Sequence, residues 1–172
     1  MRLPMIAAAA VAALLAAPAA QAEAPAKNWT APAYRIYAQA LAEATMKANP
    51  DLLSVTFHGL APGSADAYTM FAGSYPDRIG NPDDPDDIDV SKKGITIVDP
   101  RWHRTKDAAP KFVVLMPLRN ARMENIGLIV YAFKVPVESN EGERRFYTRA
   151  LDLRDALARR IPSYEALFAK AG

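Results

Sequence analysis

The chain has 172 residues, carries 21 Lys and Arg against 19 Asp and Glu, and contains no cysteine. Without cysteine, thiol catalysis, zinc-finger sites and covalent haem attachment are excluded. A net charge close to zero gives little attraction for phosphates, so we expect no nucleic-acid partner.

The N-terminus has the pattern of an export signal. Arg2 precedes a nearly unbroken apolar run over residues 5–18, and Ala20-Gln21-Ala22 fits the small-x-small motif that signal peptidase reads. The run is shorter than the roughly 20 residues that cross a bilayer, which argues against the alternative of a membrane anchor. We therefore predict a signal peptide over residues 1–22, cleavage after Ala22, a periplasmic or secreted location and no membrane span in the mature chain. The remainder has the length of one domain.

Residues 23–33 are predicted to be a flexible lead-in. A helix is predicted next, because one stripe at spacings of three and four contains Tyr34, Tyr37, Leu41, Ala44 and Ala48. Asn49-Pro50 ends this helix. Alternating apolar and polar residues from 53 to 58 predict a strand, and residues 67–73 predict a second strand that forms a hairpin with it.

Residues 74–89 are loop-like, with three prolines and with five aspartates between 83 and 89, and a short helical turn is expected before Lys92. Strands are expected at 95–98, 112–116 and 126–133, and the continuous apolar run of 112–116 is typical of a strand buried on both faces. The helical period returns in residues 141–161, with an apolar stripe made of Phe146, Ala150, Leu153, Leu157 and Ile161.

This order of elements predicts an α+β fold with one domain over residues 34–172. Its short connections favour a five-stranded antiparallel sheet, with a long N-terminal helix and a C-terminal helix packed on it.

Four segments resemble the extracytoplasmic PAS-like sensor domains called PDC or Cache domains. They are Asn49–Thr56, Tyr75–Asp84, Gly94–Asp99, and Phe112–Asn120 with Ile126–Val130. The resemblance spans about residues 34–134. It implies a small-molecule pocket on the sheet face opposite the N-terminal helix, under the loop between strands two and three. Cache domains generally sit between two membrane helices of a receptor, kinase or cyclase. Because no membrane span is predicted in the mature chain, we expect it either to relay its signal to a membrane sensor or transporter, or to act as a ligand carrier.

The candidate ligand-binding residues are Tyr75, Arg78, Tyr68, His58, Arg119 and Tyr131. Tyr75 and Arg78 lie in the loop expected over the pocket, where a phenol and a guanidinium can clamp a carboxylate. This predicts a small polar or anionic ligand. In the alternative interpretation Tyr75 packs and Arg78 pairs with Asp77 or with the aspartates that follow.

No cofactor and no metal are expected. The aspartates between 83 and 89 lack the glycine and the closing glutamate of a calcium loop, and Asp83 or Asp86 is expected to cap the following helix instead. His58 and His103 have no third ligand at metal spacing, so hydrogen-bonded or surface roles are favoured.

No catalytic motif is present: there is no Gly-x-Ser-x-Gly, no His-Glu-x-x-His and no glycine-rich phosphate loop. The expected function is therefore ligand binding rather than catalysis. The alternative is a protein–protein interaction module on the same fold, without an open pocket, with Trp102 as the contact residue.

Overall fold

The computed structural model describes residues 25–99, 111–135 and 139–172. The predicted signal peptide, Trp102 and His103 lie outside these ranges, so cleavage after Ala22 and partner contact through Trp102 stay predictions. Within the described ranges, no helix has both the length and the apolar character needed to cross a bilayer.

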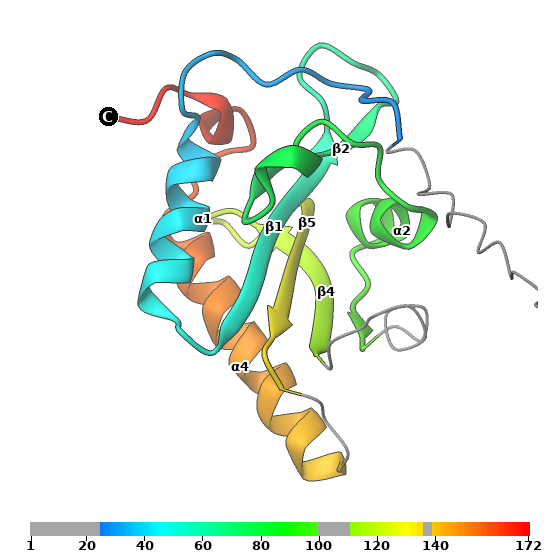
Figure 1. Ribbon diagram of the computed structural model, residues 1–172, viewed down its shortest axis with the longest axis vertical. Coiled ribbons are helices and arrows are strands. Elements are labelled where there is room, and N and C mark those ends of the chain that lie inside the picture. The colour runs from blue at the N-terminus through cyan, green and yellow to red at the C-terminus, as the bar shows by residue number, and fades with distance from the viewer. Residues whose placement is uncertain (1–24, 100–110, 136–138) are drawn as a thin grey trace, which may run out of the picture.

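Five antiparallel strands form one sheet. They are β1 (Leu52–Leu60), β2 (Tyr68–Gly73), β3 (Ile97–Val98), β4 (Phe112–Arg119) and β5 (Asn125–Phe133). Their order is β2-β1-β5-β4-β3 (Figure 1). The predicted β1–β2 hairpin and the β3–β4–β5 meander are confirmed. Pairing of β1 with β5 joins these two units at the centre of the sheet.

The helices lie on both faces of the sheet. On one face are α1 (Tyr37–Ala48), α4 (Asn140–Ala158) and the short 3-10 helix η2 (Glu165–Phe168), and on the other is α2 (Pro85–Lys93) (Figure 1). A second 3-10 turn, η1 (Pro76–Arg78), precedes α2. The predicted α+β fold class, a five-stranded antiparallel sheet with N-terminal and C-terminal helices packed on it, is confirmed.

The alternation of side chains along the strands divides the apolar residues between two clusters. The larger cluster lies beneath α1, α4 and η2 and includes Val55, Phe57, Phe71, Val114, Met116, Ile129, Tyr131 and Phe133. The smaller lies beneath α2 and consists of Val90, Val113, Leu115, Leu128 and Ala132. Strand β4 contributes to both, as its unbroken apolar run predicted. Full burial of each large apolar side chain contributes about 1.5–3 kcal/mol to folding.

The N-terminal helix differs from its prediction in both start and buried face. It begins at Tyr37 because Ile36 is extended and bridges to Lys170. The buried residues of α1 are Ala38, Leu41 and Ala42, whereas Tyr34 is 45% exposed and Ala44 and Ala48 are exposed. Only Leu41 of the predicted stripe is fully buried. The small side chains Ala38 and Ala42 face the sheet, whereas the hydroxyls of Tyr34 and Tyr37 donate to the carbonyls of Phe168 and Arg160.

For the C-terminal helix, the sequence predicted both the helix and the apolar face that packs on the sheet. Ser139 caps α4 by accepting a hydrogen bond from the Gly142 N–H, and the helix ends at Ala158 rather than 161. Leu157 and Ile161 are buried as predicted, and the ring of Phe146 lies 5.0 Å from that of Phe133. These apolar contacts hold α4 against the meander half of the sheet.

Residues 25–33 form no helix or strand, yet they contact the segment that precedes α2. The backbone N–H of Asn28 donates to the Gly80 carbonyl, and the Trp29 ring packs edge-on against Phe168. Gly80 has φ +89°, and a Cβ there would overlap the Trp29 carbonyl oxygen. Glycine is therefore required at position 80 for the two segments to meet.

Candidate functional site

A cavity of about 370 Å³ lies on the α2 face of the sheet. Its floor comes from the strands, and its cover comes from residues 75–87, which follow β2 and run into the first turn of α2. The described lining residues are Pro25, Thr56, His58, Met70, Tyr75, Arg78, Asn81, Pro82, Asp83, Asp84, Asp87, Leu115 and Val130. The position agrees with the pocket that the Cache resemblance implied, opposite α1 and under the connection from β2 to β3.

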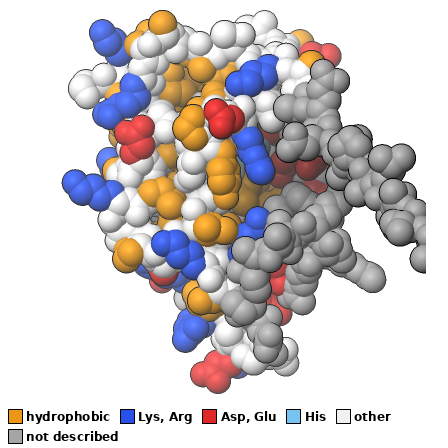
Figure 2. Space-filling view, viewed as in Figure 1, with side chains coloured by type: hydrophobic (Ala, Val, Ile, Leu, Met, Phe, Trp, Pro, Cys, Tyr) orange, Lys and Arg blue, Asp and Glu red, His pale blue; other side chains and the backbone are white. Residues whose placement is uncertain are grey.

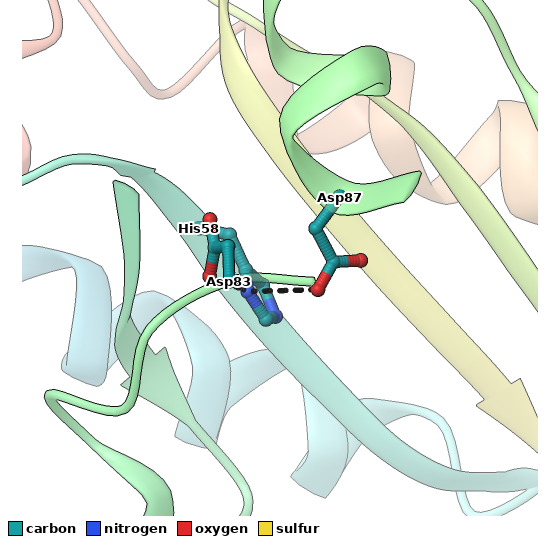
Figure 3. Close-up of side chains that lie close together, drawn as sticks. All are labelled: His58, Asp83 and Asp87. Carbon is teal, nitrogen blue, oxygen red and sulfur yellow. Dashed lines mark hydrogen bonds and ion pairs between the residues drawn. The ribbon is translucent and has the colours of Figure 1, made fainter. Parts of the chain in front are cut away.

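His58 is the central polar residue of the cavity floor. Strand β1 points Thr56 and His58 to the same face, because side chains two apart share a face. The imidazole Nε2 lies 2.7 Å from Thr56 Oγ1, and Nδ1 lies 2.7 Å from Asp83 Oδ1 and 3.8 Å from Asp87 Oδ2 (Figure 3). His58 itself is only 8% exposed. Both ring nitrogens therefore have an oxygen within hydrogen-bond distance.

Backbone hydrogen bonds place Asp83 against β2. The Asp83 N–H donates to the Tyr68 carbonyl, and the Met70 N–H donates to the Asn81 carbonyl. The Asp83 side chain is 1% exposed, and its Oδ2 is buried with no hydrogen-bond partner among the described residues. A buried carboxylate oxygen without a partner is costly, so it marks a position with a further role to explain.

The expected capping of α2 by Asp83 or Asp86 is wrong. Asp84 occupies the N-cap position and its side chain makes no capping hydrogen bond. The carboxylate of Asp87, in the first turn of the helix, instead accepts a hydrogen bond from the Asp84 backbone. Asp83 is directed at His58, which is a stronger, charge-assisted partner than a backbone N–H.

Burial and mutual charge perturb this cluster. Burial alone would lower the pKa of His58, but the charge and hydrogen bond of Asp83, together with Asp87 and Asp84, raise it above its usual value. Burial raises the pKa of Asp87 to about 6, the charges of Asp83 and Asp84 add to the rise, and His58 opposes it. The carboxylates of the cluster therefore favour a positive charge beside them, either on a protonated His58 imidazole or on a cation or cationic group that binds there.

Three of the six candidate ligand-binding residues meet at the cavity: His58, Tyr75 and Arg78. The Arg78 guanidinium lies 4.8 Å from the centre of the Tyr75 ring. Across the described ranges, Arg78 forms no ion pair with Asp77 or with the aspartates that follow. The pairing weighed as the alternative is therefore not seen, and Arg78 is an exposed residue of the cavity lining.

The other three candidates lie elsewhere. Tyr131 is fully buried on the opposite face, in the core beneath α4, while its neighbour Val130 faces the cavity. Arg119 donates to the Met123 carbonyl in the β4–β5 turn. Tyr68 is outside the lining and packs under the Lys92 ammonium, 5.0 Å from the ring centre. The strand register decided these positions, and it was not available from residue types alone.

Thr56, Asp83 and Asp87 belong to the site but were not predicted as such. Thr56 shares the polar alternation of β1 with His58, which is a signal that the sequence does contain. Thr56, His58 and Asp83 also have the order of nucleophile, base and orienting carboxylate found in hydrolases. The raised pKa of His58 favours the protonated imidazole, however, and this form cannot accept a proton. Proton abstraction from Thr56 is therefore disfavoured.

Comparison with known proteins yields no matching family model and no matching curated protein. Similar solved structures include the GAF domain of a two-component sensor histidine kinase from Bacillus halodurans, with 13% identity over 69% of this chain and 89% of that one, at a TM-score of 0.45. The Escherichia coli DcuS sensor domain has 21% identity over 67% and 70%, at 0.37. The type II free methionine-R-sulfoxide reductase of Thermoplasma acidophilum has 16% over 73% and 92%, at 0.44. These TM-scores are below 0.5, so the similarities carry no argument about ligand, reaction or partner.

Proposed function

We propose that this protein is an exported sensor domain of the Cache type. It binds a small polar molecule in the cavity between the sheet and residues 75–87, and passes the signal to a membrane sensor or transporter. The observation that carries the proposal is the cavity itself. It combines the apolar side chains of Met70, Leu115 and Val130 with several converging polar groups, which is the usual composition of a small-molecule site.

The lining favours a ligand with two different ends. Asp83, Asp84 and Asp87 contribute carboxylates at the α2 side, while Arg78 lines the same cavity beside Tyr75. A hydrogen-bond donor or positive group on the ligand suits the aspartates, and a carboxylate or other acceptor suits the guanidinium. A ligand that carries only negative charge would meet three carboxylates and one arginine.

The cavity counts against the alternative of an interaction module without an open pocket. Tyr75 is the one phenylalanine, tyrosine or tryptophan side chain among the described lining residues. The large aromatic side chains Phe57, Phe71 and Phe133 fill the core on the opposite face instead. On the face seen in Figure 2, lysine and arginine side chains are spread around hydrophobic ones with acids among them, so no single charged patch marks a partner there.

A thermal-shift screen of the purified protein against organic acids, amino acids and purines tests ligand binding. A ligand at 100-fold excess over its Kd adds about 2.7 kcal/mol to the free energy of unfolding. Arg78→Ala should weaken a carboxylate-containing ligand at least roughly tenfold, the cost expected for a lost charged hydrogen bond. Arg122→Ala is the matched control, since Arg122 pairs with Glu124 in the β4–β5 turn, outside the cavity. A panel without any hit would count against the proposal.

Export and relay need separate tests. Mass spectrometry of the protein recovered from the exported fraction should give a chain that begins at Glu23. Retention of residues 1–22 would contradict the proposed signal peptide. Crosslinking in intact cells should then capture an integral membrane protein, and capture should respond to the ligand found in the screen.

A further inference from the structure

We infer that His58, Asp83 and Asp87 form a binding site for one first-row divalent metal ion, with Zn²⁺ as the expected ion. The inference rests on the proposed function only in naming a component of the same cavity. The three residues come from β1, from the loop before α2 and from the first turn of α2, and they converge at one point (Figure 3).

The distances suit a metal ion. One ligand atom from each of the three residues lies within 4.8 Å of the other two. Zn²⁺ with nitrogen and oxygen ligands at about 2.0–2.2 Å in a tetrahedron holds its donor atoms about 3.3–3.6 Å apart. The separations from His58 Nδ1, 2.7 Å to Asp83 and 3.8 Å to Asp87, bracket this value. Small side-chain rotations would bring all three atoms to ligand positions as the ion replaces the proton between His58 and Asp83.

The residue behind the imidazole supports the same assignment. A histidine that binds metal through one ring nitrogen usually donates its other N–H to a fixed oxygen, which sets the tautomer and the ring orientation. Thr56 Oγ1 lies 2.7 Å from His58 Nε2 and supplies such an oxygen. Nδ1 is thereby left as the nitrogen that faces the two carboxylates. Thr56 is a positioning residue in this arrangement.

An independent observation comes from Asp83. Its side chain is 1% exposed and directed at His58 through Oδ1, while Oδ2 is buried without a hydrogen-bond partner among the described residues. Both oxygens of a carboxylate that is buried this deeply normally accept hydrogen bonds. A cation held between His58 and Asp87 would bind Asp83 through Oδ1 and neutralise the buried carboxylate, whose Oδ2 has no other partner among the described residues.

The donor set also selects the class of ion. Ca²⁺ and Mg²⁺ prefer oxygen ligands alone, whereas an imidazole nitrogen suits Zn²⁺ and its first-row neighbours. Two carboxylates and a neutral imidazole balance the charge of one divalent ion. The remaining coordination position would face the cavity, because all three residues line it. A bound ion would also allow an anionic ligand, held between the metal and Arg78, which the carboxylates alone would repel.

Metal titration of the purified protein tests the inference. After treatment with EDTA and dialysis, isothermal titration with Zn²⁺ should show about one ion bound per chain. His58→Gln, Asp83→Asn and Asp87→Asn should each weaken binding by roughly tenfold or more, and Thr56→Val by about 10–100-fold. Asp89→Asn should bind like the wild type, since Asp89 is an exposed carboxylate of the same helix that pairs with Lys93. Circular dichroism in EDTA establishes that each variant is folded. Co²⁺ should show visible absorption bands that change in Thr56→Val.

The inference is overturned if the folded wild-type protein does not bind Zn²⁺, or if the three ligand variants bind it as Asp89→Asn does. Competition by millimolar Mg²⁺ or Ca²⁺ would also overturn the choice of ion. Repeating the small-molecule screen with Zn²⁺ and with EDTA separates the two hypotheses. A ligand that binds equally in EDTA to a protein without Zn²⁺ affinity refutes the metal site and leaves the sensor function standing. If the protein binds Zn²⁺ but no small molecule of the screen under either condition, the metal site stands and the sensor function is refuted.

Discussion

Asp87→Asn should stabilise the metal-free protein at neutral pH, although it removes an ionic contact of His58. Burial, assisted by Asp83 and Asp84, raises the pKa of Asp87 from 3.8 to about 6, even with the opposing attraction of His58 included. A group whose folded pKa is raised contributes stability that is fully present below its unfolded pKa and is lost as the pH rises through the folded value. The wild-type protein should therefore lose stability between about pH 4 and pH 6 through this residue.

The size of the effect follows from the pKa difference. Each pKa unit corresponds to 1.36 kcal/mol, so ionising Asp87 in the folded state costs at most about 3 kcal/mol. Asparagine carries no charge, and its amide oxygen can still accept the hydrogen bond from the Asp84 backbone. For a chain of this length, about 3 kcal/mol corresponds to a rise in Tm of roughly 6–12 °C.

Thermal and urea unfolding in EDTA, at several pH values between 4 and 7.5, measure this difference. Asp87→Asn should match the wild type at the acid end and exceed it at neutral pH, whereas Asp89→Asn should track the wild type throughout. A variant that is equally or less stable than the wild type at about pH 7.5 would refute the assignment of Asp87 as an electrostatically strained carboxylate. In Zn²⁺ the advantage of Asp87→Asn should shrink, because the wild type binds the ion more tightly and gains more stability from it.

Three further substitutions test the fold around the site, each by urea unfolding. Tyr131→Phe should change the free energy of unfolding by less than about 1 kcal/mol and leave ligand and Zn²⁺ binding unchanged, since the hydroxyl has no hydrogen-bond partner among the described residues; a loss of binding would return Tyr131 to the site. Gly80→Ala should cost more than about 1 kcal/mol, because φ is +89° and a Cβ would overlap the Trp29 carbonyl; a neutral effect would contradict that contact. Met123→Gly should gain about 1 kcal/mol, because Met123 has φ +61° in an exposed turn.

The sheet could be predicted because its signals are local. Alternation in β1, the unbroken apolar run of β4 and the short connections each follow from a few neighbouring residues, and the two hairpins form as expected. The buried face of α1 could not be predicted, because tyrosines and alanines are both acceptable on an apolar stripe. The choice of Ala38 and Ala42 depends on how closely the helix approaches β1 and β2.

Only part of the site could be predicted, because some of its residues are brought together by contacts between elements that are distant in the sequence. Tyr75, Arg78 and His58 were identified, but Asp83 was expected to cap the following helix and Asp87 was only one of several aspartates in an acidic loop. Their role depends on the hydrogen bond from the Asp83 N–H to Tyr68, which fixes the loop along β2 and turns the carboxylate toward β1. A distance of 25 residues between His58 and Asp83 carries no signal of such a contact.

The same placement changes what the cavity is expected to bind. Arg78 alone pointed to an anionic ligand, yet three aspartates lie along the same lining and His58 is held between two of them. In metal-free protein the cavity should therefore prefer a ligand with a positive or donor group. With a divalent ion between His58, Asp83 and Asp87, the preference should shift toward anions that reach both the metal and Arg78. Screening the same ligands with Zn²⁺ and with EDTA should thus give different hits, and identical hits under both conditions would show that ligand choice is set by Arg78 and the aspartates without a metal.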